Sequence, residues 1–262
     1  MCQFSMMILI AAIGALPNAD ARPDGAEPGT GADFRIDNAV YLGEGKEPLC
    51  RSTTIFHEGV VYDCMRAPSE TIVFDMSAGR FILLNLKNRT RAELTTGEVA
   101  SFADRLQEVA ARSPDPLVKF LAAPKFREHV DRASGTLTLD SPLVVYRLTL
   151  LPEQDPRVVA QYHEFSDWYA RLNALLSPGS RPPFGRLVVN AALAQRKATA
   201  SKVMLTLSSD GKSDREPITI RSEHRLVRPL TRVDLERVDQ ARKQMVGFKP
   251  VRFVEYRKTD LR

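Results

Sequence analysis

The sequence predicts an α+β protein in which a curved antiparallel sheet of consecutive hairpins carries about four packed helices. Two observations support this fold class. Residues 34–94 consist of short β-rich runs separated by turns, and several later segments repeat apolar residues at helical spacing. The composition agrees, because a 262-residue chain with 44% hydrophobic and 26% charged residues can bury a substantial core.

The first part of the chain reads as six strands in succession. They are Phe34–Leu42, Cys50–Phe56, Val60–Met65, Glu70–Met76, Arg80–Leu86 and Thr90–Leu94. The connections between them are too short for parallel crossovers, which need a dozen or more residues. The segment is therefore predicted to be an antiparallel meander.

The hairpin between Cys50 and Cys64 predicts a disulfide. Its tip is read as a three-residue loop, His57-Glu58-Gly59, which places both cysteines on one face when residues are counted by twos. A bridge closing a loop of this size would contribute about 3 kcal/mol to stability. The alternative is a pair of buried thiols that are not joined.

Four helices are predicted after residue 95. Thr95 and Glu98 form a capping box for a helix over residues 97–112, and Asp115-Pro116 starts a shorter one. Asp155 caps a helix over residues 156–176. The last helix begins at Thr231–Asp234, runs through Met245, and is expected to turn Leu235, Val238, Ala241 and Met245 inward. The remaining predicted strands lie within 135–151 and at Leu187–Ala194, Lys202–Ser209, Ile218–Val227 and Val251–Tyr256.

The N-terminal residues predict export. Residues 1–21 read as a signal peptide cleaved after Ala21, and 22–33 as a flexible lead-in to a single domain over 34–262, with an alternative boundary near 152–156. The longest apolar stretch, Met6–Leu16, has eleven residues, whereas a membrane-spanning helix needs about 20. The chain is thus expected to be periplasmic or extracellular and not to span a membrane. Export also disfavours a nucleic-acid partner.

The positive charge is concentrated near the C-terminus. Residues 215–262 contain 13 Lys and Arg against 7 Asp and Glu. Arg221, Arg225, Arg228 and Arg232 lead this stretch and are candidates for contact with an anionic envelope component. The alternative is a solvated surface of mixed sign, because acidic residues alternate with the arginines.

One group of residues has the spacing of a metal site. His163 and Asp167 are four residues apart on a predicted helix, with Glu164 beside them, which resembles half of a zinc-protease motif. The alternative is a set of ordinary polar residues on the outer face of that helix. No convergent set of catalytic residues is recognisable, so the sequence favours a non-catalytic protein without a cofactor.

Three segments resemble the LolA- and LolB-type family of periplasmic lipoprotein carriers. They are IFHEGVVYDC, ETIVFDMSAGRFILLN, and RTRAEL with the helix that follows it. The resemblance implies a half-barrel sheet wrapped over helices, with an apolar interior that accepts acyl chains. It assigns no function to any single residue.

Three functions are compatible with these features. The first is an exported non-catalytic binding protein that holds an apolar or amphiphilic, lipid-like ligand between sheet and helices. The second is an envelope-associated structural protein that contacts an anionic surface through its basic C-terminal region. The third is a metal-assisted hydrolase.

Overall fold

The computed structural model describes residues 31–67, 69–177, 180–208 and 217–259. The predicted signal peptide lies outside the described residues. The described strands are β1 (Phe34–Leu42), β2 (Cys50–His57), β3 (Val60–Met65), β4 (Glu70–Asp75), β5 (Arg80–Asn85), β6 (Thr90–Thr95), β7 (Arg127–Asp131), β8 (Thr136–Asp140), β9 (Val144–Pro152), β10 (Ala198–Leu207), β11 (Ile218–Val227) and β12 (Lys249–Pro250). The described helices are α1 (Thr96–Ala111), α2 (Pro116–Ala122), α3 (Pro156–Leu176), α4 (Phe184–Gln195), α5 (Arg232–Gly247) and α6 (Phe253–Thr259).

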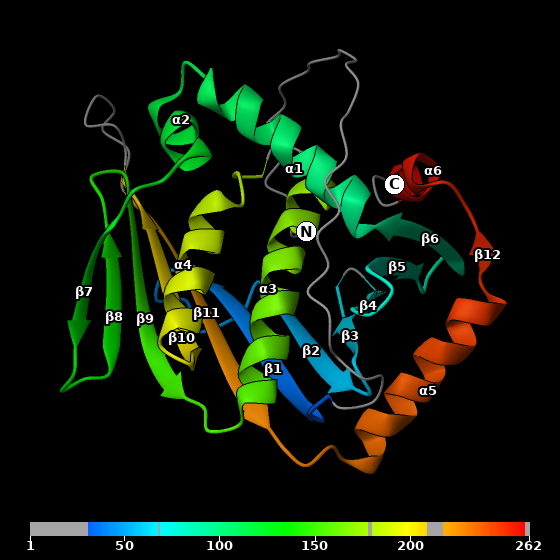
Figure 1. The fold of residues 1–262 in the computed structure, drawn as a ribbon. Coiled ribbons are helices and arrows are strands. Elements are labelled where there is room, and N and C mark those ends of the chain that lie inside the picture. The colour runs from blue at the N-terminus through cyan, green and yellow to red at the C-terminus, as the bar shows by residue number, and fades with distance from the viewer. Residues whose placement is uncertain (1–30, 68, 178–179, 209–216, 260–262) are drawn as a thin grey trace.

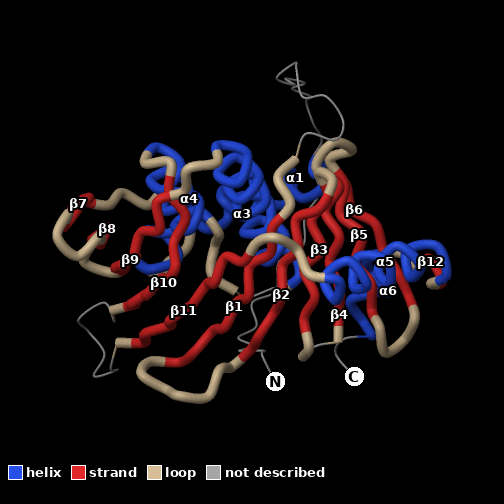
Figure 2. Tube along the Cα trace, turned by 90° about the horizontal axis from the view of Figure 1, so that it is seen from below, coloured by secondary structure: helices blue, strands red, loops and turns tan. Residues whose placement is uncertain are grey.

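All twelve described strands belong to one sheet, so the α+β class is confirmed. The order is β12-β6-β5-β4-β3-β2-β1-β11-β10-β9-β8-β7, and every pair is antiparallel except β12 with β6. Strands β1 to β6 are consecutive neighbours, which confirms the predicted meander. Strands from both sides of residues 152–156 lie in this same sheet. The sheet is open, and it curves around α3 (Figures 1 and 2).

The curvature gives the sheet a concave face that is covered by α1, α2, α3 and α4 (Figures 1 and 2). Two apolar clusters fill the space beneath these helices. One joins α1 and α3 to strands β1–β6, and the other joins α2 and α4 to strands β8–β10. A third cluster lies on the opposite, convex face, where α5 packs against β2–β5. The meander is thus covered by helices on both faces.

The four predicted helix caps are confirmed, including Asp155 at the start of α3. Thr95 and Glu98 form the predicted capping box of α1, and Asp115 caps α2 with Pro116 in its first turn. The side chain of Thr231 likewise caps α5. One predicted core residue of that helix is wrong, because Leu235 is 39% exposed beside the buried Val238 and Ala241.

Two predicted strands are helices, and the helix count of four is therefore too low for the described residues. Leu187–Ala194 lies in α4, where burial of Val189, Ala192 and Leu193 follows helical spacing rather than alternation. Val251–Tyr256 overlaps α6, which has Glu255 in its first turn and basic residues in its last. In both places β-branched residues gave a strand signal that tertiary packing overrode.

The predicted Cys50–Cys64 disulfide is wrong, because the hairpin tip is shorter than expected. His57 pairs with Val60, so only Glu58 and Gly59 form the loop, both with positive φ (52° and 74°). This two-residue turn places Thr53 opposite Cys64. Cys50 is three residues from Thr53 along β2, and the two cysteines therefore lie on opposite faces of the sheet. No disulfide joins them.

The last residues of the predicted lead-in are held against the domain. Ala32 is buried, and its N–H donates to Oε1 of Gln161 in α3 at 2.8 Å. Asp33 Oδ2 lies 2.9 Å from Nδ1 of His57. Ordered contacts thus begin before Phe34, where the sequence predicts the domain to start.

Candidate functional site

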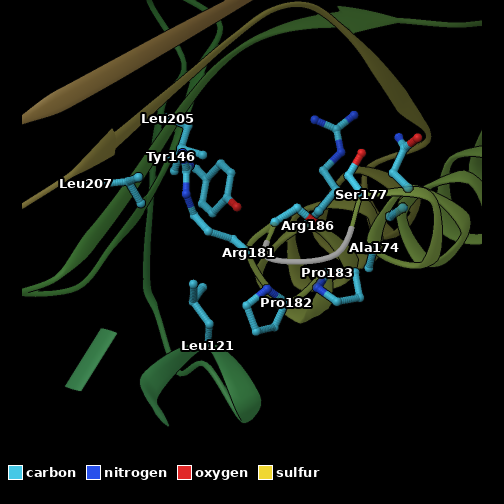
Figure 3. Close-up of a pocket in the computed structure, with 13 residues that line it drawn as sticks. Leu121, Tyr146, Ala174, Ser177, Arg181, Pro182, Pro183, Arg186, Leu205 and Leu207 are labelled. Atoms are coloured by element: carbon cyan, nitrogen blue, oxygen red, sulfur yellow. The ribbon is translucent and has the colours of Figure 1, made fainter. Parts of the chain in front are cut away.

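A pocket of about 280 Å³ lies between the α3–α4 connection and the concave face of the sheet (Figure 3). Its main apolar residues are Leu121, Tyr146, Pro182, Pro183, Leu205 and Leu207. Its polar residues are Asn173, Ser177, Ser180, Arg181 and Arg186. Small-molecule pockets typically measure roughly 300–1,000 Å³, so this one fits a short ligand or one end of a longer one.

The local sequence explains why a pocket forms at this place. Helix α3 ends at Leu176, and two prolines precede α4, of which Pro183 is the N-cap. Gly185 in the first turn allows α4 to approach the sheet closely. A Cβ atom there would lie 3.2 Å from both Leu121 Cδ2 and the hydroxyl oxygen of Tyr146. The helix start is therefore fixed against one wall of the pocket.

Two arginines place their charge in this pocket. Although Arg181 as a residue is exposed, burial of its guanidinium lowers the pKa, and the neighbouring Tyr146 partly offsets this effect. Burial raises the pKa of Tyr146, while Arg186 and Arg181 oppose the rise. Within the described residues, no carboxylate oxygen lies within 4.0 Å of either guanidinium. The pocket thus carries two positive charges that no described acid pairs with.

The charge of Arg186 also acts on two histidines of the interior. Burial, with a smaller contribution from Arg186, lowers the pKa of His224 on β11 to about 3. Burial is likewise the main cause of the lowered pKa of His163 on α3, to which Arg186 adds. Both imidazoles are therefore neutral at physiological pH.

His224 belongs to a hydrogen-bonded chain on the concave face. Asn38 Nδ2 donates to Ser52 Oγ at 3.1 Å and to Thr54 Oγ1 at 2.9 Å. Its Oδ1 therefore faces Nδ1 of His224, at 2.8 Å, and that nitrogen must carry the proton. Thr54 in turn donates to Asp63 Oδ1 at 2.7 Å.

This series of hydrogen bonds ends on α3, where the hydroxyl of Tyr169 donates to Asp63 Oδ2 at 2.5 Å. Burial and the Asp63 carboxylate raise the pKa of Tyr169 well above its ordinary value, so the phenol stays protonated. Neither residue lines the pocket. This chain of hydrogen bonds satisfies buried polar groups and connects the sheet to α3.

The four arginines predicted to contact an anionic surface all have carboxylate partners. Arg221 Nη1 lies 3.0 Å from Glu223, and Arg225 Nη2 lies 2.8 Å from Asp37. The other two pairs are Arg228 with Glu153 and Arg232 with Glu236, at 2.9 and 3.1 Å. Their charge is therefore locally balanced.

The residues of the predicted metal site have separate partners. His163 Nε2 lies 3.1 Å from the carbonyl oxygen of Ala198, and Asp167 Oδ1 accepts a hydrogen bond from Asn190 Nδ2 at 2.7 Å. Glu164 is exposed. Among the described residues, no group of three or more His, Cys, Asp and Glu side chains is arranged to hold a metal ion.

A local feature of the sequence distinguishes the pocket arginines. They lie in a stretch without acidic residues, which is not visible when charges are summed over larger parts of the chain. Between Asp167 and Asp210 there is no acidic residue, whereas six are basic. Arg181 and Arg186 lie in this stretch, so no acid near them in the sequence can pair with them. Only the fold shows that they meet at one pocket.

No family model matches the chain, and no curated protein shows significant similarity to it. In the part of the chain that the structure describes, no helix has the length and apolarity to cross a membrane.

Proposed function

We propose that this chain is a non-catalytic binding protein that holds an amphiphilic ligand in the pocket between the concave face and the α3–α4 connection. The observation that carries the proposal is the composition of this pocket. The pocket is lined both by leucine and proline side chains and by hydroxyl, amide and guanidinium groups. Such a wall matches a molecule with an apolar and a polar end.

The fold supports the proposal because the pocket opens between a curved sheet and its covering helices. A carrier of the LolA and LolB type would hold an acyl chain in a comparable interior. Export through residues 1–21 is part of this proposal, since an extracytoplasmic binding protein needs a signal. The anionic-surface function is not carried further, because each of its four arginines already has a carboxylate partner.

The proposal predicts that a bulky side chain in the pocket weakens binding. Ala170 lines the pocket from α3, and Ala170→Trp places an indole where the ligand would lie. Excluding two methylene groups of a dodecyl chain should reduce affinity about tenfold. The measurement is isothermal titration with dodecyl amphiphiles below their critical micelle concentrations.

The matched control is Ala191→Trp, which adds the same side chain at an exposed position of α4. It should bind as the wild type does. The proposal is wrong if wild-type protein binds none of the dodecyl compounds. It is also wrong if a folded Ala170→Trp protein binds them with unchanged affinity.

A further inference from the structure

We infer that the polar end of the ligand is an oxyanion, a phosphate or a carboxylate, recognised by the pocket arginines Arg181 and Arg186. This inference rests on the proposed function and specifies its ligand. The two arginines line one pocket, and both of them act on the same Tyr146 side chain. Figure 3 shows Arg181 beside the Tyr146 ring.

The positive charge of the pocket has no described counter-charge. Arg186 is half-buried and burial lowers the pKa of Arg181, so an anionic partner would stabilise both charges. The chain provides such partners elsewhere, as in Arg228 with Glu153, but not at this pocket within the described residues. A bound anion would supply the missing negative charge.

The pocket also offers a set of hydrogen-bond donors that suits an oxyanion. Each guanidinium offers a planar fork of N–H groups that suits the oxygens of a phosphate or carboxylate. Asn173, Ser177 and Ser180 add amide and hydroxyl donors to the same pocket. Both anions share this recognition chemistry, and the additional donors allow three or more oxygens to be bound.

Arg186 lies in the first turn of α4, where the helix itself favours an anion. This twelve-residue helix has no side-chain cap at its start, where Pro183 is the N-cap. The partial positive charge of a helix N-terminus favours an anion nearby. It adds to the field of the two arginines and repels a cationic head group.

The test compares four ligands that share one dodecyl chain, measured by titration at constant ionic strength. They are dodecyl phosphate, dodecanoate, the neutral dodecyl maltoside and the dodecyltrimethylammonium cation. Both anions should bind at least about tenfold more tightly than the neutral compound, and the cation least tightly. The tighter of the two anions identifies the head group as phosphate or carboxylate.

The double change Arg181→Gln, Arg186→Gln should abolish the preference for anions. The control Arg196→Gln, near the other end of α4, should keep it, because Arg196 pairs with Glu128 outside the pocket. On the wild type alone, added salt should weaken dodecyl phosphate binding more than maltoside binding, which keeps the test valid if the double variant misfolds.

Two negative outcomes have different meanings. Equal affinity of the wild type for the neutral and anionic compounds would overturn the inference and leave the amphiphile-binding function standing. Failure of the wild type to bind any of the four compounds would overturn the proposed function itself.

Discussion

Replacement of Arg35 by methionine should lower the free energy of unfolding by roughly 3 kcal/mol, because it breaks a buried ion pair and leaves one charge behind. Arg35 Nη1 donates to both carboxylate oxygens of Asp234, at 3.0 and 2.8 Å. The Asp234 side chain is 0% exposed. Without Arg35, this carboxylate keeps its bonds from Thr231 and a longer contact with Arg237 Nη1 at 3.8 Å, but loses both hydrogen bonds from Arg35.

The electrostatics of Asp234 agree with this expectation. Burial alone would raise its pKa, but hydrogen bonds from Thr231 and Arg35 outweigh burial and lower it. The carboxylate is therefore charged at neutral pH. The same side chain belongs to the capping box of α5, so the ion pair connects the start of α5 to β1.

Urea unfolding followed by the fluorescence of Trp168, the single tryptophan, measures this loss. The control is Arg225→Met, whose pair with Asp37 is equally short at 2.8 Å but whose side chain is 74% exposed. It should cost less than about 1 kcal/mol. An equal loss in the two variants would contradict the role assigned to burial.

This ion pair illustrates what the sequence predicts and what it leaves open. The spacing of Thr231 and Asp234 predicts the helix start, because capping is a local interaction between residues three apart. Arg35 lies 199 residues earlier, and no local pattern connects it to Asp234. The pairing becomes visible only when β1 and α5 are placed in the fold.

The same distinction explains which strands were predicted. Within β1 to β6, buried and less buried residues alternate, as in β1, or nearly all residues are buried, as in β4 and β5. Short turns separate these strands, so their hydrophobic pattern predicts them clearly. Strand β7 is exposed at all five residues and has no hydrophobic pattern, so the sequence did not predict it. Its position follows from pairing with β8 alone.

The candidate site shows a further limit. The cysteine pairing depended on one residue of loop length, since a change from three to two residues reverses which face each side chain occupies. The shared location of Arg181 and Arg186 at one pocket depends on where the residues between α3 and α4 lie relative to β9 and β10. The sequence singles out arginines in a stretch rich in basic residues, whereas the structure distinguishes arginines by whether a carboxylate lies near them.

Lowering the pH from 7 to 5 should cost the wild type about 2 kcal/mol through His224 alone. The pKa of His224 is about 3 in the folded state, against 6.5 for a solvent-exposed imidazole in the unfolded chain. Between these values the unfolded state binds a proton that the folded state does not. Stability is therefore lost as the pH falls through this range and is fully present above about 6.5.

His224→Gln removes the titrating group and keeps an amide that can donate to Oδ1 of Asn38. Between pH 7 and 5, the free energy of unfolding of this variant should fall by about 2 kcal/mol less than that of the wild type. His163 contributes in the same direction but is unchanged in this variant, so the difference isolates His224. The matched control is His129→Gln, the same substitution on the exposed strand β7. Parallel pH curves for His224→Gln and the wild type would show that His224 is not held neutral by its burial and by Arg186.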